Sequence, residues 1–294
     1  MENIAEPNQR LEQGLGIVLV VASAVFFSLA GIFTKLISAD LWTIVCWRGL
    51  FGALLITLYV GLRGGLQVRK ADLGLGWRGL VLATVGSAAT LCFIGAFKHT
   101  FVANVAILYA TAPFMAAALE YLFRRTPVRP SVAVATLVST IGVGVMVFAG
   151  LGSGLWFGDA LAMLMAFGSA LYMVLIRLFR DTPVVLAAAL SSLQLFVLGW
   201  FFADPLAVSA DDAMLLAMFG ASFSAAAILW TEGTRLVTAA ESGLLGSAEV
   251  PLAIVFAWLI LADIPPPASL AGGAIVLIAV GVHAVRDFAA ARRA

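Results

Sequence analysis

The sequence predicts an all-α integral membrane protein with ten transmembrane helices, arranged as two inverted five-helix repeats. Three observations lead to this class. Of 294 residues, 63% are hydrophobic and only 11% are charged, whereas a soluble domain carries about 25% charged residues. The apolar residues fall into ten segments, each near the roughly 20 residues that a helix needs to cross a bilayer. Two of these segments, half a chain apart, share the same proline-broken pattern.

The ten segments follow one another with short connections, which leave no room for a soluble domain. The first is too long to be the apolar core of a cleavable signal peptide, so we expect it to stay in the membrane. The predicted spans are 14–36, 41–62, 77–97, 101–123, 131–150, 156–178, 184–202, 213–233, 240–262 and 268–287.

The proline-broken pattern occurs at 100–131 and again 138 positions later at 238–269. Each copy is an apolar helix with a proline near its middle, Pro113 in the first and Pro251 in the second, followed by a proline-rich exit. Few residues are identical between the copies, so organisation rather than sequence identity carries the repeat. The pattern predicts two related halves.

We assign the halves to residues 14–150 and 156–287, with five spans in each. Because five is an odd number, the second half enters the membrane upside down relative to the first. This inverted-repeat plan is typical of secondary transporters, in which the substrate site lies near the middle of the bilayer between the halves.

Basic residues predict the orientation, because cytoplasmic connections carry an excess of Lys and Arg. With the N-terminus inside, only Lys35 and Lys98 fall on the outer side, and Arg48 falls within the second span. Both termini are therefore predicted to be cytoplasmic. The fourteen basic residues on the inner side are Arg10, Arg63, Arg69, Lys70, Arg78, Arg124, Arg125, Arg129, Arg177, Arg180, Arg235, Arg286, Arg292 and Arg293.

Two stretches carry a family resemblance. An arginine followed by an apolar run opens the second span at 47–59, and a proline-broken helix with an acidic exit and a glycine-bearing last helix covers 248–282. The chain resembles the drug/metabolite transporter superfamily, in particular its ten-helix transporters with paired EamA-type repeats. This resemblance implies a multi-pass protein of the plasma membrane (the inner membrane of bacteria) that exports amino acids, drugs or other metabolites. Within the family it looks most like amino-acid exporters, including the YddG-like aromatic group.

The chain departs from the family at the exit of the fourth span. Where the family commonly has a glycine–glutamate pair, this sequence has Arg124 and Arg125. Only Asp263, in the second half, keeps the acidic character. A symmetric acidic pair at the two exits is therefore not expected here.

Four polar residues occupy matching positions of the two repeats. Asn104 and Thr111 are seven residues apart and so share one helix face. Ser242 and Glu249, which lie 138 positions later in the second repeat, share a helix face in the same way. Such a face can line a substrate cavity, or its polar groups can simply form hydrogen bonds between helices. We include all four among the candidate substrate-binding residues.

Glu249 is the most informative single residue, because a carboxylate near the bilayer centre is costly and usually faces the interior. Three roles fit: a proton site, a contact for a substrate ammonium group, or an ion-pair partner of Arg48. At ~1.5 Å per residue, the two residues lie at depths about 6 Å apart in a ~30 Å apolar core. Arg48 is the second charged candidate of the site.

Three aromatic residues complete the candidate substrate-binding set. Phe27 and Trp230 lie among small and polar residues of the first and eighth spans, and Tyr109 lies beside the break of the fourth. Small residues also mark close helix packing, which is the alternative explanation of the faces that carry Phe27 and Trp230.

The sequence predicts no catalytic residues, no metal site and no cofactor. His99 and His283 lie apart from each other and from Cys46 and Cys92, and no HExxH, GxSxG or P-loop motif occurs. A secondary transporter is the function that the pattern favours, with a membrane-embedded enzyme as the alternative class. Only Arg48 is a deep cation, whereas phosphate groups need several. We therefore expect small zwitterionic or neutral amphipathic substrates such as amino acids, or alternatively drugs, with lipids as the surroundings and no nucleic-acid partner.

Single cysteines test the orientation. At Gly152, Ser209 and Pro266 they should react with a membrane-impermeant thiol reagent added outside, because these connections carry few basic residues. Cysteines at the basic connections, at Gly65, Thr126 and Asp181, should react only after the membrane is permeabilised. The reversed pattern of labelling would contradict the orientation.

Overall fold

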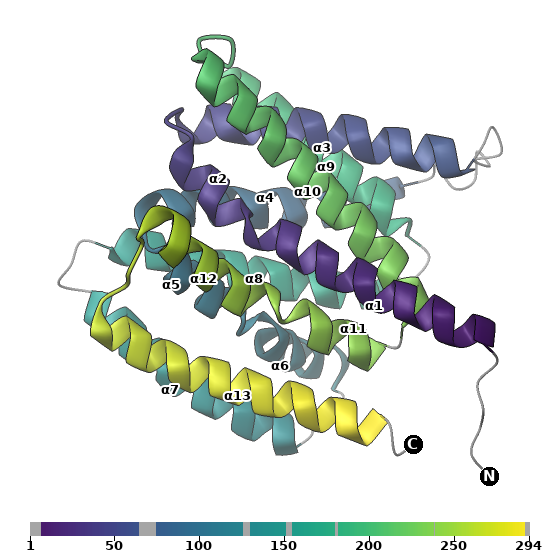
Figure 1. The fold of residues 1–294 in the computed structure, drawn as a ribbon, viewed down its shortest axis with the longest axis vertical. Helices are drawn as coiled ribbons and strands as arrows, with labels where there is room; N and C mark the ends of the chain where they lie inside the picture. The colour runs from purple at the N-terminus through teal and green to yellow at the C-terminus, as the bar shows by residue number, and fades with distance from the viewer. Residues whose placement is uncertain are drawn as a thin grey trace.

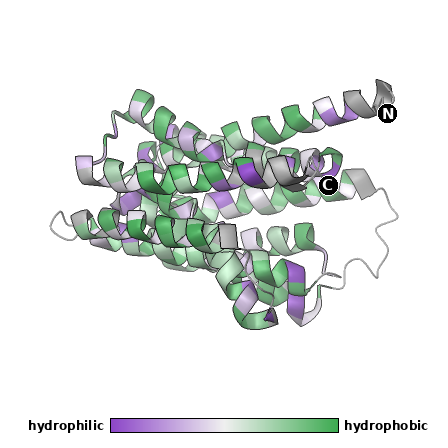
Figure 2. Cartoon of the chain, turned by 90° about the horizontal axis from the view of Figure 1, so that it is seen from below, coloured by the Kyte–Doolittle hydropathy of each residue, from purple (hydrophilic) through white to green (hydrophobic). Residues whose placement is uncertain are grey.

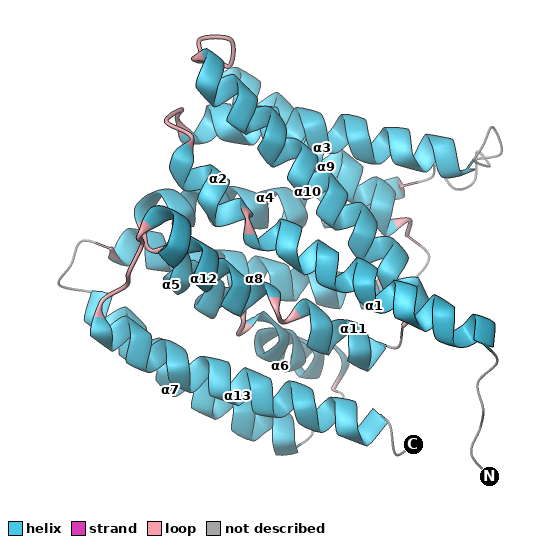
Figure 3. Ribbon diagram, in the orientation of Figure 1, coloured by secondary structure: helices cyan, strands magenta, loops and turns pink. Residues whose placement is uncertain are grey.

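The structure is a computed structural model in which residues 7–64, 75–125, 130–150, 155–179, 182–237 and 239–291 are described. Within these ranges all secondary-structure elements are helices, which are joined by loops, and there is no strand (Figure 3). Several positions used above lie outside the described residues: Gly65, Arg69, Lys70, Thr126, Arg129, Gly152, Arg180, Asp181, Arg292 and Arg293.

Thirteen helices account for the described chain. Seven predicted spans are single helices, and the other three are each divided into two. The helices are α1 (Pro7–Ser28), α2 (Ala30–Leu36), α3 (Leu41–Gly64), α4 (Gly76–His99), α5 (Val102–Tyr109), α6 (Ala112–Arg124), α7 (Pro130–Gly150), α8 (Trp156–Leu178), α9 (Val184–Phe202), α10 (Ala210–Leu236), α11 (Ala239–Gly246), α12 (Glu249–Leu261) and α13 (Pro267–Ala291).

All ten predicted spans are helical where the structure describes them, as predicted for an all-α membrane protein. Seven described helical segments are long and apolar enough to cross a bilayer, and the stretches Ala133–Val145, Glu249–Leu261 and Ser269–His283 are shorter apolar helices in the remaining three spans. Figure 2 shows hydrophobic residues along the whole length of most helices, as expected for surfaces that face lipid. The two ends of the chain lie at the same end of the bundle (Figure 1).

Both predicted proline breaks are present. α5 ends at Tyr109 and α6 begins at Ala112, while α11 ends at Gly246 and α12 begins at Glu249. Proline has no N–H, so a carbonyl one turn back loses its helical partner. At the second break the carbonyl of Ser247 instead accepts from the N–H of Val250 at 3.3 Å. A tighter turn thus replaces the bond that Pro251 removes.

The exits of the two broken helices match as well. Arg125 after α6 and Ala262 after α12 are the described non-glycine residues with positive φ, at 55° and 51°. A left-handed residue is a common way to end a helix. The family's acidic exit residue is retained only as Asp263, whose Oδ2 accepts from the backbone N–H of Val102 at 2.8 Å, the first residue of α5.

Helix packing follows the inverted-repeat plan. Each span of one half corresponds to the span five places away in the other half. Under this correspondence the contacting pair α4–α8 maps onto the contacting pair α10–α1, and α4–α9 maps onto α10–α3. The pairs α3–α9 and α7–α13 each correspond to themselves. Such exchange is what a two-fold relation between two five-helix halves produces.

Carboxylates cap the bundle at the end opposite the termini. Asp40 accepts from the N–H groups of Trp42 and Thr43 at the start of α3, and Asp212 Oδ1 accepts from the N–H of Ser38. Burial alone would raise the pKa of Asp40, but the hydrogen bonds from Thr43 and Trp42 outweigh it and hold this pKa below its usual value. Lys98 Nζ donates to the carbonyl of Ile37 at 2.6 Å, which further ties the α2–α3 connection to α4.

α3 and α9 approach so closely that glycine is required between them. A methyl group on Gly49 would lie 2.5 Å from both the amide nitrogen of Phe196 and the carbonyl oxygen of Ser192. Backbone atoms cannot move aside without displacing the helix. Small residues of this kind are typical of helix contacts in membranes.

We therefore expect Gly49→Ala to lower the free energy of unfolding in detergent micelles by about 1–3 kcal/mol, through overpacking. Gly61→Ala, in the same helix but with no atom within 4 Å of the added methyl, is the matched control. It should be neutral or stabilising, because alanine is the better helix former. Equal losses in both variants would contradict the close approach.

Candidate substrate cavity

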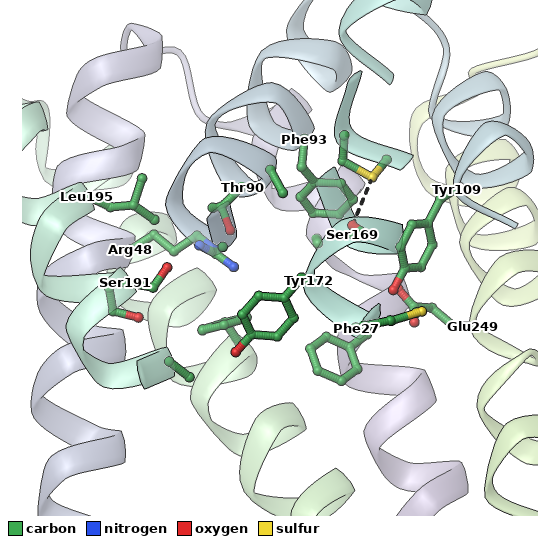
Figure 4. Close-up of a pocket in the computed structure, with 18 residues that line it drawn as sticks. Phe27, Arg48, Thr90, Phe93, Tyr109, Ser169, Tyr172, Ser191, Leu195 and Glu249 are labelled. Carbon is green, nitrogen blue, oxygen red and sulfur yellow. Dashed lines mark hydrogen bonds between the residues drawn. The ribbon is translucent and has the colours of Figure 1, made fainter. Parts of the chain in front are cut away.

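The two halves together line a cavity of about 320 Å³. Helices α1, α2, α3, α4 and α5 of the first half line it, together with α8, α9, α10 and α12 of the second. It lies beside the break between α11 and α12, because Glu249, the first residue of α12, is part of its lining. Residues that face it include Phe27, Arg48, Thr90, Tyr109, Tyr172 and Glu249 (Figure 4).

Arg48 supplies a positive charge to one wall. Its side chain is 5% exposed, and its Nε has no hydrogen-bond partner. The guanidinium carbon lies 3.8 Å from the centroid of the Phe223 ring and 5.8 Å from that of Phe219. These cation–π contacts replace part of the lost hydration, and Figure 4 shows the guanidinium pointing into the cavity.

Glu249 places a carboxyl group on the opposite wall. It is the first residue of α12, so the helix break brings its carboxylate to the cavity. Phe27 and Tyr109 lie beside it, with the Tyr109 hydroxyl directed toward the carboxylate (Figure 4). The break thus explains why a costly carboxylate sits at this depth: it faces the interior rather than lipid.

The predicted ion pair between Arg48 and Glu249 is not formed. Neither residue makes an ion pair or hydrogen bond with any described side chain, and Figure 4 shows them on opposite sides of the cavity. The depth estimate compared only their heights in the membrane. It did not include the lateral separation of α3 and α12, which only the packing of the bundle determines. Of the three roles considered for Glu249, the proton site and the ammonium contact remain.

Asn104 and Thr111 lie away from the described lining of the cavity. Asn104 is 1% exposed, and its Nδ2 donates to Asp159 Oδ1 at 3.1 Å and to Thr100 Oγ1 at 3.3 Å. Thr111 donates to the carbonyl of Leu108 within its own helix break. The alternative explanation of this face, interhelical hydrogen bonding, is therefore the one that fits. The partner that sequence reasoning missed is Asp159, a buried carboxylate on α8.

Ser242 and Trp230 also lie outside the described lining. Ser242 is buried in α11, and Trp230 packs against α11 so closely that a methyl group on Gly246 would lie 2.6 Å from its ring. The sequence-predicted residues that the structure brings together are Phe27, Arg48, Tyr109 and Glu249. They come from four different spans.

Several lining residues were missed by sequence reasoning although their spacing gave a signal. Three helices each present a polar or small face with intervals of three and four residues, the period of one helix side. The polar side chains on these faces are Thr90 on α4, Ser169 and Tyr172 on α8, and Ser191 and Ser192 on α9. Ser191 is held by Ser87 on α4, whose hydroxyl also donates to Gln194 Oε1 at 2.7 Å.

Residues 14–148, which span almost the whole first half, match the EamA-like transporter family. The resemblance drawn from the sequence is thereby confirmed over these residues, and the match is to a family of membrane transporters. Members of this family are transporters rather than enzymes.

Solved structures share the fold of this chain. One of them, titled "Crystal structure of protein", superposes with a TM-score of 0.65 over 92% of this chain and 98% of its own, at 17% sequence identity. The likeness covers both halves, so the overall fold is common to the two proteins. No curated protein matches the sequence.

The separation of Arg48 from Glu249 gives a prediction for stability. Arg48→Gln should change the free energy of unfolding by the same amount in the wild-type and Glu249→Gln backgrounds, to within about 0.5 kcal/mol, because residues without contact or shared partners act additively. Breaking a buried ion pair would instead couple them by several kcal/mol, about 3–5. Coupling of that size in a double-mutant cycle would restore the ion-pair interpretation.

Proposed function

We propose that the protein exports small amphipathic metabolites, above all amino acids with apolar or aromatic side chains, by alternating access through the cavity between its two repeats. The observation that carries the proposal is the cavity itself. It lies between the two five-helix halves, and its described lining combines aromatic walls with one cation and one carboxylate, Arg48 and Glu249.

The charge of the lining favours zwitterionic or neutral substrates. A carrier of sugar phosphates or nucleotide sugars needs several cationic contacts for each phosphate, whereas Arg48 is the single cation among the described lining residues. Aromatic and aliphatic side chains, such as Phe93, Tyr172 and Leu195, suit an apolar substrate part.

The size of the cavity favours metabolites over bulky drugs. Ligand pockets for drug-sized molecules hold roughly 300–1,000 Å³, and this cavity, at about 320 Å³, is at the small end of that range. Export of larger amphipathic drugs is therefore the second candidate function. A membrane-embedded enzyme, the third possibility raised by the sequence, has no support from the family.

The inverted arrangement of the two halves supports an alternating-access mechanism. Exchange of the two halves' conformations converts a state open on one side of the membrane into a state open on the other.

Liposomes that contain the purified protein test the substrate class. We expect counterflow of at least some neutral amino acids, with apolar and aromatic ones preferred, and none of sugar phosphates or nucleotide sugars. Protein-free liposomes give the background. Robust exchange of a phosphorylated compound would overturn the proposal.

The same liposomes separate the two remaining roles of Glu249. If Glu249 carries a coupling proton, Glu249→Gln should abolish net transport driven by a pH gradient and leave counterflow intact. If it contacts the substrate's ammonium group, the same variant should weaken counterflow itself.

A further inference from the structure

Arg48 carries a buried charge that the protein leaves without a counter-ion. A guanidinium keeps its charge in proteins and offers five N–H donors. No described residue accepts a hydrogen bond from it or lies within ion-pair distance, although its side chain is only 5% exposed. Such an arrangement is costly unless something else supplies the missing negative charge.

The surroundings of Arg48 hold the guanidinium in place without neutralising it. The Phe223 ring covers it at 3.8 Å, and the Phe219 ring lies 5.8 Å away. Contact with ring faces leaves the N–H groups, which lie in the plane of the guanidinium, available at its edge. That edge lies toward the cavity (Figure 4).

We propose that Arg48 binds the carboxylate of the transported molecule. A planar carboxylate matches the planar fork of a guanidinium and forms two parallel hydrogen bonds with it. The bound substrate then supplies the counter-ion that the protein lacks. This inference rests on the proposed function, and it adds a defined substrate group and its binding residue.

Glu249 lies on the opposite wall, so the far end of the cavity offers no cation to a second carboxylate among its described lining residues. The aromatic residues between the walls, including Phe27 and Tyr172, receive an apolar side chain. The site is therefore built for a monocarboxylate with an apolar or aromatic body. An amphipathic amine of the same size, which lacks the carboxylate, would place no anion against Arg48.

Three probes that share one aromatic body isolate the carboxylate. Phenylalanine has a carboxylate and an ammonium group, 3-phenylpropanoate has only the carboxylate, and 2-phenylethylamine has only the ammonium group. Binding is measured in detergent by isothermal titration and by the ligand-induced rise in Tm. We expect phenylalanine and 3-phenylpropanoate to bind the wild-type protein, and 2-phenylethylamine to bind at least 10-fold more weakly.

Substitution of Arg48 tests the residue itself. Arg48→Gln should weaken binding of both carboxylates by about 10- to 100-fold, the range expected for hydrogen bonds to a charged group, and should leave 2-phenylethylamine unchanged. Arg48→Lys keeps the charge but not the planar fork, and it should give an intermediate loss. Arg78→Gln is the matched control, because Arg78 also lies over aromatic rings, at 5.8 Å from Trp77 and 5.7 Å from Phe179, but is exposed and outside the cavity lining.

The outcomes distinguish the inference from the proposed function. If 2-phenylethylamine binds the wild-type protein as well as phenylalanine does, the carboxylate assignment is wrong even without any variant. If amino acids are transported but folded Arg48→Gln binds them unchanged, the assignment fails while the function stands. If 3-phenylpropanoate binds and depends on Arg48 but no amino acid binds or is transported, the assignment stands and the amino-acid proposal fails.

Discussion

A backbone carbonyl that loses its helical partner inside a bilayer finds no water to replace it, and this constraint governs the whole architecture. Broken helices are tolerated only where they face protein or a cavity. Pro113 and Pro251 break two spans, so the backbone groups freed at these breaks must face protein or a cavity. The α5–α6 and α11–α12 spans accordingly contact each other and the inner helices, and the cavity forms beside the second break.

The position of Glu249 follows from the same break. As the first residue of α12, it faces a region where the helix is interrupted and the neighbouring helices do not fill the space. A carboxylate there costs less than one facing lipid. The bundle thus places a carboxyl group on one wall, while the α3–α9 pair, brought close by Gly49, places Arg48 on the other.

A transporter gains from leaving these charges apart. Had Arg48 and Glu249 paired across the cavity, the pair would have filled the site and satisfied both groups without a ligand. Their separation leaves a small space with a guanidinium on one wall, a carboxyl group on the other and aromatic side chains between. The hydrogen bonds that stabilise the bundle lie elsewhere, in the Thr100–Asn104–Asp159 cluster and the Ser87–Ser191 contact between α4 and α9.

The amino-acid sequence by itself determined the membrane class, the ten spans, the two proline breaks and four residues of the cavity, because span length, apolar content and missing N–H groups are local properties of the chain. Only the tertiary structure decided which polar residues meet. Asn104 shares a helix face with Thr111, yet it turns to Asp159, and Arg48 matches Glu249 in depth but not in lateral position. Periodicity fixes a residue's height and side on its own helix, whereas the packing of ten helices fixes what that side faces.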